Sequence, residues 1–362
     1  MKKKMPLDPA QVRSILAVNL GGIGDVLLST PALRALKGRF HQARLTMLVV
    51  PRAAELARSL PFVDDVVEYP LNAALPGAGK LALLLVRLRS RRFDLALNMR
   101  TLVSRAGAFK IRLLLGALGA RVNAGRNTCG WGRFFDVSIH EDLPGQQHEM
   151  DYDLDLSRAL GCAVPDQVVH MDIPGVAERS AGDFLRRQGA GDGTLLIGLH
   201  PGGKPSHRWP QERFIALIDS LHRHVPEAVF VLTADAQEKQ LTAAIAARAG
   251  GTVIDCAGRF SLAETAALIR RCRVYVTNDT ANMHIAASLR VPLVALFGPG
   301  YVARFDPRRL DPLAAVMTVS SDCAPCDKSS CRTMDCLKGI AVKDVTDRVI
   351  ALLRSPQKGN DV

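Results

Sequence analysis

The stretch TNDTANMHIAASLRVPLVALFGP, from Thr277 to Pro299, decides the fold. An apolar run stops at Asp279, a small-residue segment typical of a helix follows from about Thr280 to Leu289, and a second apolar run ends at a Gly-Pro pair. This order of strand, turn, helix and strand predicts part of a parallel sheet. It puts backbone N–H groups and the positive end of a helix dipole at the carboxyl edge of the sheet, where open α/β sheets bind anionic ligands.

Two polar residues lie in the first turns of this predicted helix. Asp279 either caps the helix through its side chain or faces a ligand. His284 either sits half-buried in the packing or contacts the same ligand. The spacing alone leaves both alternatives open.

The same alternation of strand and helix signals runs along the whole chain. The first half has predicted strands at Ser14–Leu20, Leu45–Val50 and Phe93–Met99, and the second half has them at Thr194–His200 and Ala228–Ala234. A helical pattern follows each of them. Two successive βαβ runs of similar size predict an α/β protein made of two doubly wound, Rossmann-like domains that face each other across a cleft.

Glycine and proline residues cluster between Leu160 and Gly193, which makes this segment the best domain boundary. We therefore expect an N-terminal domain at 1–175, a C-terminal domain at 190–340, and a C-terminal helix and tail at 341–362. The segment 125–148 looks rich in loops.

Composition limits the classes of partner. The chain has 362 residues and a net charge of +12, which favours nucleic acid, anionic lipid or phosphorylated substrates as partners. Only 5% of the residues are aromatic and the sequence has no nucleic-acid-binding motif, so a non-enzymatic nucleic-acid binder is the weaker alternative. The basic start, MKKKMPLDPAQVR, lacks the apolar stretch of a signal peptide, and apolar runs such as Leu81–Val86 are too short to cross a bilayer. The eight cysteines suit a reducing compartment, so we expect a cytoplasmic protein.

The turn Gly21-Gly22-Ile23-Gly24-Asp25 resembles a dinucleotide-binding motif but does not match it. The third glycine of that motif is missing, because its position is Leu27. What remains is a tight turn that brings backbone close to a ligand and projects Asp25 from the start of a helix. On local sequence alone, Asp25 is either a catalytic carboxylate or an acidic residue favoured by the helix dipole.

Three blocks of the sequence together resemble glycosyltransferase family nine. They are ILAVNLGGIGDVLLSTPALRAL, LHPGGKPSHRWPQERF and TNDTANMHIAASLRVPLVALFGP, and the resemblance runs from about Ser14 to Ile340. The best-known members of this family are the ADP-heptose:lipopolysaccharide heptosyltransferases. The resemblance implies a GT-B fold, inverting chemistry, no metal or other cofactor at the reacting centre, an N-terminal domain that holds the acceptor and a C-terminal domain that holds the nucleotide sugar.

The resemblance also implies roles for single residues. The general base of the family is the Asp of its GDV motif, here Asp25, which takes the proton from the acceptor hydroxyl as that oxygen attacks the anomeric carbon. Arg100 and Arg105 follow a predicted strand, so we expect them to hold an acidic acceptor such as a Kdo or a phosphate-bearing core sugar. The acceptor-binding set is Gly22, Gly24, Arg100 and Arg105, and the donor-binding set is Gly202, Gly203, Lys204, His207, Arg208, Asp279, Thr280, Ala281 and His284.

The chain departs from the family pattern at two positions. The family usually has DTG at the start of the helix, where this chain has Ala281, whose Cβ limits how closely a phosphate approaches. The family also places a Lys two residues before its Trp-Pro pair, where this chain has His207. Either Lys204 or Arg208 is then the cation for the diphosphate, unless the segment is simply a solvated basic loop.

The implied partners are ADP-heptose and a lipopolysaccharide core acceptor; a related enzyme with another nucleotide sugar or a protein acceptor is the alternative. The predicted helix Lys80–Arg92 is basic and amphipathic. It is either a solvated face or a surface that rests on the anionic inner membrane. The leucines predicted to touch the lipid are Leu81, Leu84, Leu85 and Leu88, beside Arg87, Arg89, Arg91 and Arg92.

Four cysteines lie within a short segment near the C-terminus: Cys323, Cys326, Cys331 and Cys336. Four sulfurs this close are able to form a tetrahedral structural metal site, although the spacing departs from common zinc and iron–sulfur patterns. Reduced thiols and disulfides are the alternatives. The remaining cysteines look like small core residues, namely Cys129, Cys162, Cys256 and Cys272.

Overall fold

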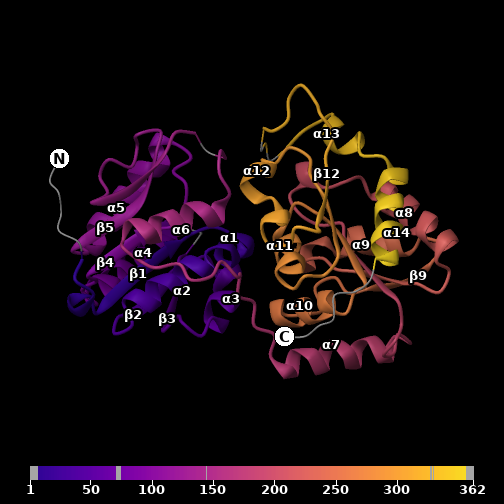
Figure 1. Cartoon of the computed structure of the whole chain (residues 1–362), viewed down its shortest axis with the longest axis horizontal. Coiled ribbons are helices and arrows are strands. Elements are labelled where there is room, and N and C mark those ends of the chain that lie inside the picture. The colour runs from indigo at the N-terminus through magenta and orange to yellow at the C-terminus, as the bar shows by residue number, and fades with distance from the viewer. Residues whose placement is uncertain (1–6, 71–74, 144, 327, 329, 356–362) are drawn as a thin grey trace. The chain divides into compact units, whose positions relative to one another are not determined.

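A computed structural model describes residues 7–70, 75–143, 145–326, 328 and 330–355 (Figure 1). The basic head at 1–6 and the end of the predicted tail at 356–362 lie outside the described residues. The chain divides into two compact units, Met1–Met171 and Asp172–Val362.

The first unit contains a parallel sheet with the strand order β3-β2-β1-β4-β5-β6. Its strands are β1 (Ser14–Asn19), β2 (Arg44–Val49), β3 (Asp65–Glu68), β4 (Leu95–Asn98), β5 (Val122–Thr128) and β6 (Val137–Glu141). Its helices are α1 (Ile23–Leu28), α2 (Thr30–Arg39), α3 (Ala54–Ser59), α4 (Leu75–Arg89), α5 (Arg105–Leu118) and α6 (Glu149–Ala159).

The second unit contains a parallel sheet with the order β12-β11-β10-β7-β8-β9. Its strands are β7 (Leu196–His200), β8 (Val229–Leu232), β9 (Thr252–Asp255), β10 (Val274–Asn278), β11 (Leu293–Leu296) and β12 (Ala315–Met317). Its helices are α7 (Gly175–Arg187), α8 (Gln211–His224), α9 (Lys239–Ala246), α10 (Leu262–Arg270), α11 (Ala281–Ser288), α12 (Val302–Phe305), α13 (Asp335–Lys338) and α14 (Val342–Arg354).

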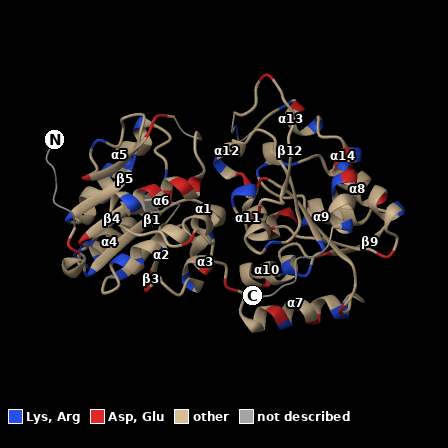
Figure 2. Cartoon of the chain, viewed as in Figure 1, with Lys and Arg blue, Asp and Glu red and all other residues tan. Residues whose placement is uncertain are grey.

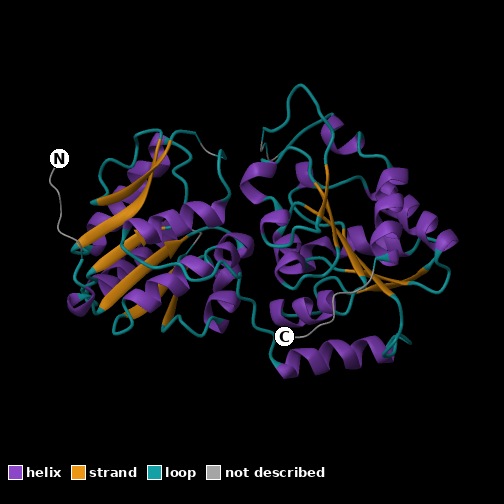
Figure 3. Ribbon diagram, in the orientation of Figure 1, coloured by secondary structure: helices purple, strands orange, loops and turns teal. Residues whose placement is uncertain are grey.

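Both sheets are doubly wound, with helices packed around them (Figure 3). In each sheet the chain builds outward in one direction and then returns to build in the other. The order therefore reverses between β1 and β4 in the first sheet, and between β7 and β10 in the second. The crevice beyond the carboxyl ends of the strands at such a reversal is where open α/β sheets bind ligands. The predicted α/β, GT-B class is confirmed.

The first sheet is covered on both faces. Leu16 and Val18 of β1 pack with Leu84, Leu88 and Leu115 of α4 and α5. The intervening residues of β1 point to the opposite face and are equally buried. A strand buried on both faces explains why β1 reads as a continuous apolar run instead of an alternating one.

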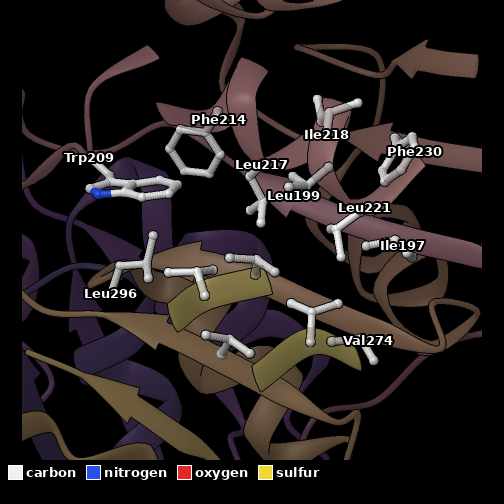
Figure 4. Packing of buried hydrophobic residues seen from close by; sticks show 14 of the residues in the cluster. Ile197, Leu199, Trp209, Phe214, Leu217, Ile218, Leu221, Phe230, Val274 and Leu296 are labelled. Carbon is white, nitrogen blue, oxygen red and sulfur yellow. The ribbon is translucent and has the colours of Figure 1, made fainter. Parts of the chain in front are cut away.

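The core of the second unit is organised around Trp209 (Figure 4). Its indole meets the ring of Phe214 edge to face, with centroids 5.2 Å apart, and its Nε1 donates a hydrogen bond to the carbonyl oxygen of Ile340, 3.2 Å away. Val345 and Val349 of α14 belong to the same cluster. The C-terminal helix is therefore packed into the second unit.

Several elements differ from the sequence prediction. The segment 125–148, expected to be loop-rich, contains most of β5 and all of β6. The long helix expected after the glycine turn is two helices, since the chain bends at Ser29 between α1 and α2. Helix α7, which lies in the stretch left between the two expected domains, packs against α10 in the second unit.

Trp209→Ala is expected to destabilise the second unit by about 3–5 kcal/mol, because it removes a fully buried aromatic ring and leaves a cavity. Urea unfolding followed by far-UV circular dichroism measures the loss. Leu313→Ala, at a residue 59% exposed in the same unit, is the matched control and should change stability by less than about 0.5 kcal/mol. Equal losses in both variants would contradict the assignment of Trp209 to the core.

Candidate active site

Two predicted site residues meet at the strand reversal of the first sheet. Asp25 follows the turn after β1, and Arg100 follows β4, the neighbouring strand on the other side of the reversal. The two side chains form an ion pair. Both are mostly buried, with 16% of the Asp25 side chain and 24% of the Arg100 side chain exposed. The sequence therefore folds so that a carboxylate and a guanidinium share the place where a ligand is expected.

The glycine turn fixes the orientation of Asp25. Gly22 is the N-cap of α1 and Asp25 is its third residue. The backbone N–H of Gly22 donates to Oδ2 of Asp25 over 2.7 Å. A Cβ on Gly21 would lie 2.4 Å from the same oxygen, so any larger residue there displaces the carboxylate. The glycines thus serve the placement of one carboxylate.

Arg100 is shared between two carboxylates. Besides Asp25, its Nη1 lies 3.6 Å from Oε2 of Glu149. Burial lowers the pKa of Arg100, but the charges of Asp25 and Glu149 outweigh it and raise that pKa above its ordinary value. Arg100 therefore remains a cation.

A fully buried arginine lies behind this pair. Arg126 of β5 donates to Glu149 over 2.7 Å and to Asp153 over 2.5 Å, both on α6. Burial raises the pKa of Asp153 to about 6, although Arg126 and the hydroxyl of Ser29 act against it. Oγ of Ser29 lies 2.5 Å from Oδ2 of Asp153 and 2.8 Å from the main-chain oxygen of Asp25.

The other predicted acceptor residues fall into two groups. Gly22 and Gly24 belong to the start of α1, next to Asp25. Arg105 is exposed on the first turn of α5, and no ion pair is described between it and the pair of Asp25 and Arg100. The role of Arg105 in binding the acceptor stays a prediction.

In the second unit, the loop after β7 is fastened to the end of β10. The buried side chain of Asn278 donates to the carbonyl oxygens of Pro201 and Gly202 over 3.0 and 2.9 Å, and it accepts from the N–H of Trp209 over 3.0 Å. The loop therefore stays at the strand reversal of the second sheet, with the predicted donor residues on it.

Arg208 braces this loop from within. Its Nε donates to the carbonyl oxygen of Gly203 over 2.6 Å, and its Nη2 pairs with Glu238 over 2.7 Å. Glu238 also accepts from the N–H of Gly203. A carboxylate balances the charge of Arg208, and Lys204 is exposed on the same loop, so both cations stay candidates to contact a diphosphate.

His207, which replaces the family's Lys, is buried in the short 3₁₀ helix Pro205–His207. Its Nδ1 lies 3.0 Å from Oγ of Ser206. That hydroxyl donates to the carbonyl oxygen of Lys328, in the cysteine-rich segment. His207 is thus part of the packing under the loop.

The start of α11 lies beside this loop. A Cβ on Gly203, whose φ is +117°, would lie 2.9 Å from Cγ2 of Thr280. Thr280 is the N-cap and Ala281 the first helical residue, so Asp279 is not the cap residue that one interpretation expected. The carboxylate of Asp279 lies against Gly300, where an added Cβ would be 2.3 Å away.

His284 is almost fully buried, with its ring 5.9 Å from that of Phe305. The prediction that the His284 side chain is half-buried was therefore wrong. His284 and His207 are both buried, and their role in donor binding stays a prediction.

The cysteine-rich segment holds four free thiols. Cys336 packs in the core of the second unit, whereas Cys323 and Cys331 are exposed. Across the described residues, no group of three or more His, Cys, Asp or Glu side chains is arranged to hold a metal ion. The structural metal therefore stays a prediction. Cys129 is exposed, with a φ of +50°, so its assignment to the core was wrong.

Sequence reasoning missed the polar residues that support both loops. Glu149 and Asp153 are four residues apart, so they share one face of α6, and that spacing was a usable signal. Arg126 gave no signal, because an arginine in a segment that reads as a loop is expected to be solvent-exposed. Asn278 was visible only as the end of an apolar run, and Glu238 only as part of a predicted helix cap.

Comparison with known proteins decides the family. The family described as glycosyltransferase family 9 (heptosyltransferase) matches residues 82–337. The chain belongs to glycosyltransferase family 9. Lipopolysaccharide heptosyltransferase 2 of Escherichia coli is 25% identical over 295 residues, which cover 79% of this chain and 82% of that protein. As a member of the family, the chain is a glycosyltransferase.

Solved structures agree with this fold. The ADP-heptose lps heptosyltransferase II of E. coli superposes with a TM-score of 0.73 at 22% identity, covering 94% of this chain and 98% of that one. The E. coli heptosyltransferase WaaC with ADP gives 0.65 at 20% identity, covering 93% and 97%. At these identities the likeness establishes the fold alone.

Gly21→Ala is expected to lower the glycosyltransferase rate at least about tenfold, because the added methyl displaces the carboxylate of Asp25. Steady-state kinetics measure the effect. Gly38→Ala is the matched control: Gly38 lies in α2 with open space around its Cα, so the change should leave the rate unchanged and stabilise the fold by about 0.5–1 kcal/mol. Full activity in Gly21→Ala would show that the turn tolerates a side chain.

Proposed function

We propose that this glycosyltransferase transfers a heptosyl residue from ADP-heptose to an acidic sugar of a lipopolysaccharide core, with inversion at the anomeric carbon and without a metal at the reacting centre. The names of its relatives support the donor and the acceptor class. The observation that carries the proposal is the buried pair of Asp25 and Arg100 at a strand reversal. It supplies a base and a cation for an acidic acceptor in one place.

Asp25 acts as the general base in this proposal. Its carboxylate takes the proton of the acceptor hydroxyl while that oxygen attacks the anomeric carbon from the face opposite the nucleotide. General-base help of this kind contributes about 10²–10⁴-fold to a rate. Arg100 binds a carboxylate or phosphate of the acceptor, for which a planar guanidinium is suited.

The second unit holds the nucleotide in this proposal. The leaving diphosphate gains negative charge as the glycosidic bond breaks. The N-terminal turn of α11 and Lys204 on the neighbouring loop supply the opposite charge. Asn278 and Glu238 keep the loop in position, so the donor side is organised before the donor binds.

Asp25→Asn is expected to lower kcat by at least about 10²-fold while the affinity for ADP changes less than about twofold, because the amide keeps the shape of the side chain but does not accept the proton. ADP release from ADP-heptose with truncated lipopolysaccharide acceptors measures the first effect, and titration with ADP measures the second. NMR of the product reports the anomeric configuration.

Two controls make this test decisive. Activity that survives a chelator supports a metal-free centre, and a panel of other nucleotide sugars tests the donor. Normal turnover in Asp25→Asn would remove Asp25 from the mechanism, and transfer from another nucleotide sugar in preference to ADP-heptose would replace the proposed donor.

The proposal extends to where the enzyme works, which is the surface of an anionic membrane. Within the described residues, each helix is too short or too polar to span a bilayer. Helices α4 and α5 pack together and both carry basic residues (Figure 2). Exposed apolar residues lie on the same two helices. The apolar residues are Leu83, Val86, Phe109 and Leu113, and the basic ones are Lys80, Arg87, Lys110 and Arg112.

This surface corrects the one expected from the sequence. Leu84 and Leu88 are buried in the core, so they do not face lipid. Helix α4 ends at Arg89, and Arg91 beyond it pairs with Asp65. The exposed apolar residues of this surface come instead from both α4 and α5, whereas the sequence prediction considered one helix alone.

The double variant Arg87→Gln with Arg112→Gln is expected to weaken binding to phosphatidylglycerol-containing vesicles about tenfold or more, since each basic residue near an anionic surface contributes about 1 kcal/mol. Phe109→Ser should weaken it by removing buried apolar area. Co-sedimentation measures both. Leu313→Ser, an exposed leucine of the second unit, is the matched control and should bind normally. Binding that ignores lipid charge and salt would contradict this part of the proposal.

A further inference from the structure

Both oxygens of Asp25 are engaged in the structure. Oδ2 accepts from the N–H of Gly22, and Oδ1 is paired with Arg100. A carboxylate oxygen that is paired with a guanidinium is already occupied, so it is not free to accept a proton from an acceptor hydroxyl. If Asp25 is the base, Arg100 has to move away from it when the acceptor binds. Another carboxylate then has to compensate part of the positive charge of Arg100.

Glu149 is in position to do so. Its Oε2 lies 3.6 Å from Nη1 of Arg100. The same oxygen accepts from Nη1 of Arg126 over 2.7 Å. Arg126 is fully buried, so Glu149 is held by a cation that has no route to solvent. Glu149 therefore stays in place while Arg100 shifts.

The contacts close into a ring that begins and ends on Asp25. From the Asp25 side chain it runs through Arg100, Glu149 and Arg126 to Asp153. Asp153 meets the hydroxyl of Ser29, which lies 2.8 Å from the main-chain oxygen of Asp25. At one end of the ring, Arg100 places a positive charge beside the Asp25 carboxylate. At the other end, Ser29 connects Asp153 to the main chain of α1, the helix that carries Asp25.

We propose that Glu149 is a positioning residue of the transfer reaction: it shares Arg100 with Asp25, so that Arg100 turns to the acidic acceptor and leaves Asp25 free to take the proton. Arg126, Asp153 and Ser29 hold Glu149 and α1 at a fixed separation. This inference rests on the proposed function of Asp25. It adds three acidic or basic side chains to the reaction that touch no substrate.

The charges around Asp25 come from several elements, and each affects the test. Arg100 follows β4, Glu149 and Asp153 lie on α6, and Arg126 lies on β5. Arg52 is also near, because a Cβ on Gly22 would lie 3.6 Å from its Nη2. Variants of Arg100 and Glu149 alter opposite charges at the same place, so their effects on Asp25 should have opposite signs.

The pH profile of kcat/KM shows the direction of each effect on Asp25. Glu149→Gln removes a negative charge and leaves Arg100 to Asp25 alone, so the acid limb should move down by about one pH unit and the plateau rate should fall about tenfold. Arg100→Gln should move the acid limb up by a similar amount. Asp65→Asn, which breaks the ion pair with Arg91 in the same unit, is the matched control and should leave the profile unchanged.

A double-mutant cycle tests the ring without any activity. Asp25→Asn and Glu149→Gln share Arg100, so the unfolding equilibrium constant of the double variant should depart about tenfold from the value expected for independent changes. Fluorescence of Trp131 reports on the first unit in a Trp209→Phe background, because these are the two tryptophans of the chain. Asp25→Asn with Asp65→Asn should be additive.

The outcomes separate the two proposals. Loss of transfer in Asp25→Asn, together with an unmoved pH limb in a normally folded Glu149→Gln, would overturn the role of Glu149 and leave the base intact. An additive cycle for Asp25 and Glu149 would overturn it as well. Normal turnover in Asp25→Asn would remove the proposed base, and with it the role of Glu149 in catalysis, while the cycle would still report whether the ring exists.

Discussion

The contact on which the first unit depends is that of Arg126 with Glu149 and Asp153. A guanidinium with no exposed surface is stable in a protein only when carboxylates surround it, and removing one partner of such a pair costs about 3–5 kcal/mol. This contact ties β5 to α6. Through Ser29 it also ties α6 to the helix that carries Asp25. The core sets the general shape, but the buried charges set where this carboxylate lies.

In the second unit, an uncharged amide and one ion pair hold the loop after β7 in place. Asn278 uses both ends of its amide to hold the loop after β7 from beneath. Glu238 holds the same loop from the side through Arg208 and the N–H of Gly203. Each sheet thus places polar residues at its strand reversal, and these fix a glycine-rich loop that the hydrophobic core cannot hold. Loops held in this way are organised before a ligand arrives, which lowers the entropy lost on binding.

The sequence predicts the strands whose side chains are mostly apolar and misses β5, which carries a buried charge. β1 and β10 read clearly, because continuous apolar runs are typical of parallel strands covered on both faces. β5, with the sequence VNAGRNT, reads as a loop because Arg126 and its polar neighbours look solvent-exposed. For the same reason Asp25 was predictable from a motif, whereas Glu149 and Asp153 gave only the signal of their spacing on α6, because their partner Arg126 is on a strand that the pattern hides.

Arg100, which the sequence assigned to the acceptor, is paired with Asp25, the base in the proposed mechanism, and this pairing constrains how the proposed site works. An arginine without a carboxylate partner in the free protein would gain the full energy of its contact with the acidic acceptor on binding. Arg100 instead exchanges one carboxylate for another acidic group, so the net gain is the difference between the two contacts. An acceptor without an acidic group leaves Arg100 on Asp25 and the base occupied. In the proposed mechanism, the ion pair therefore couples recognition of charge on the acceptor to the availability of Asp25 as the base.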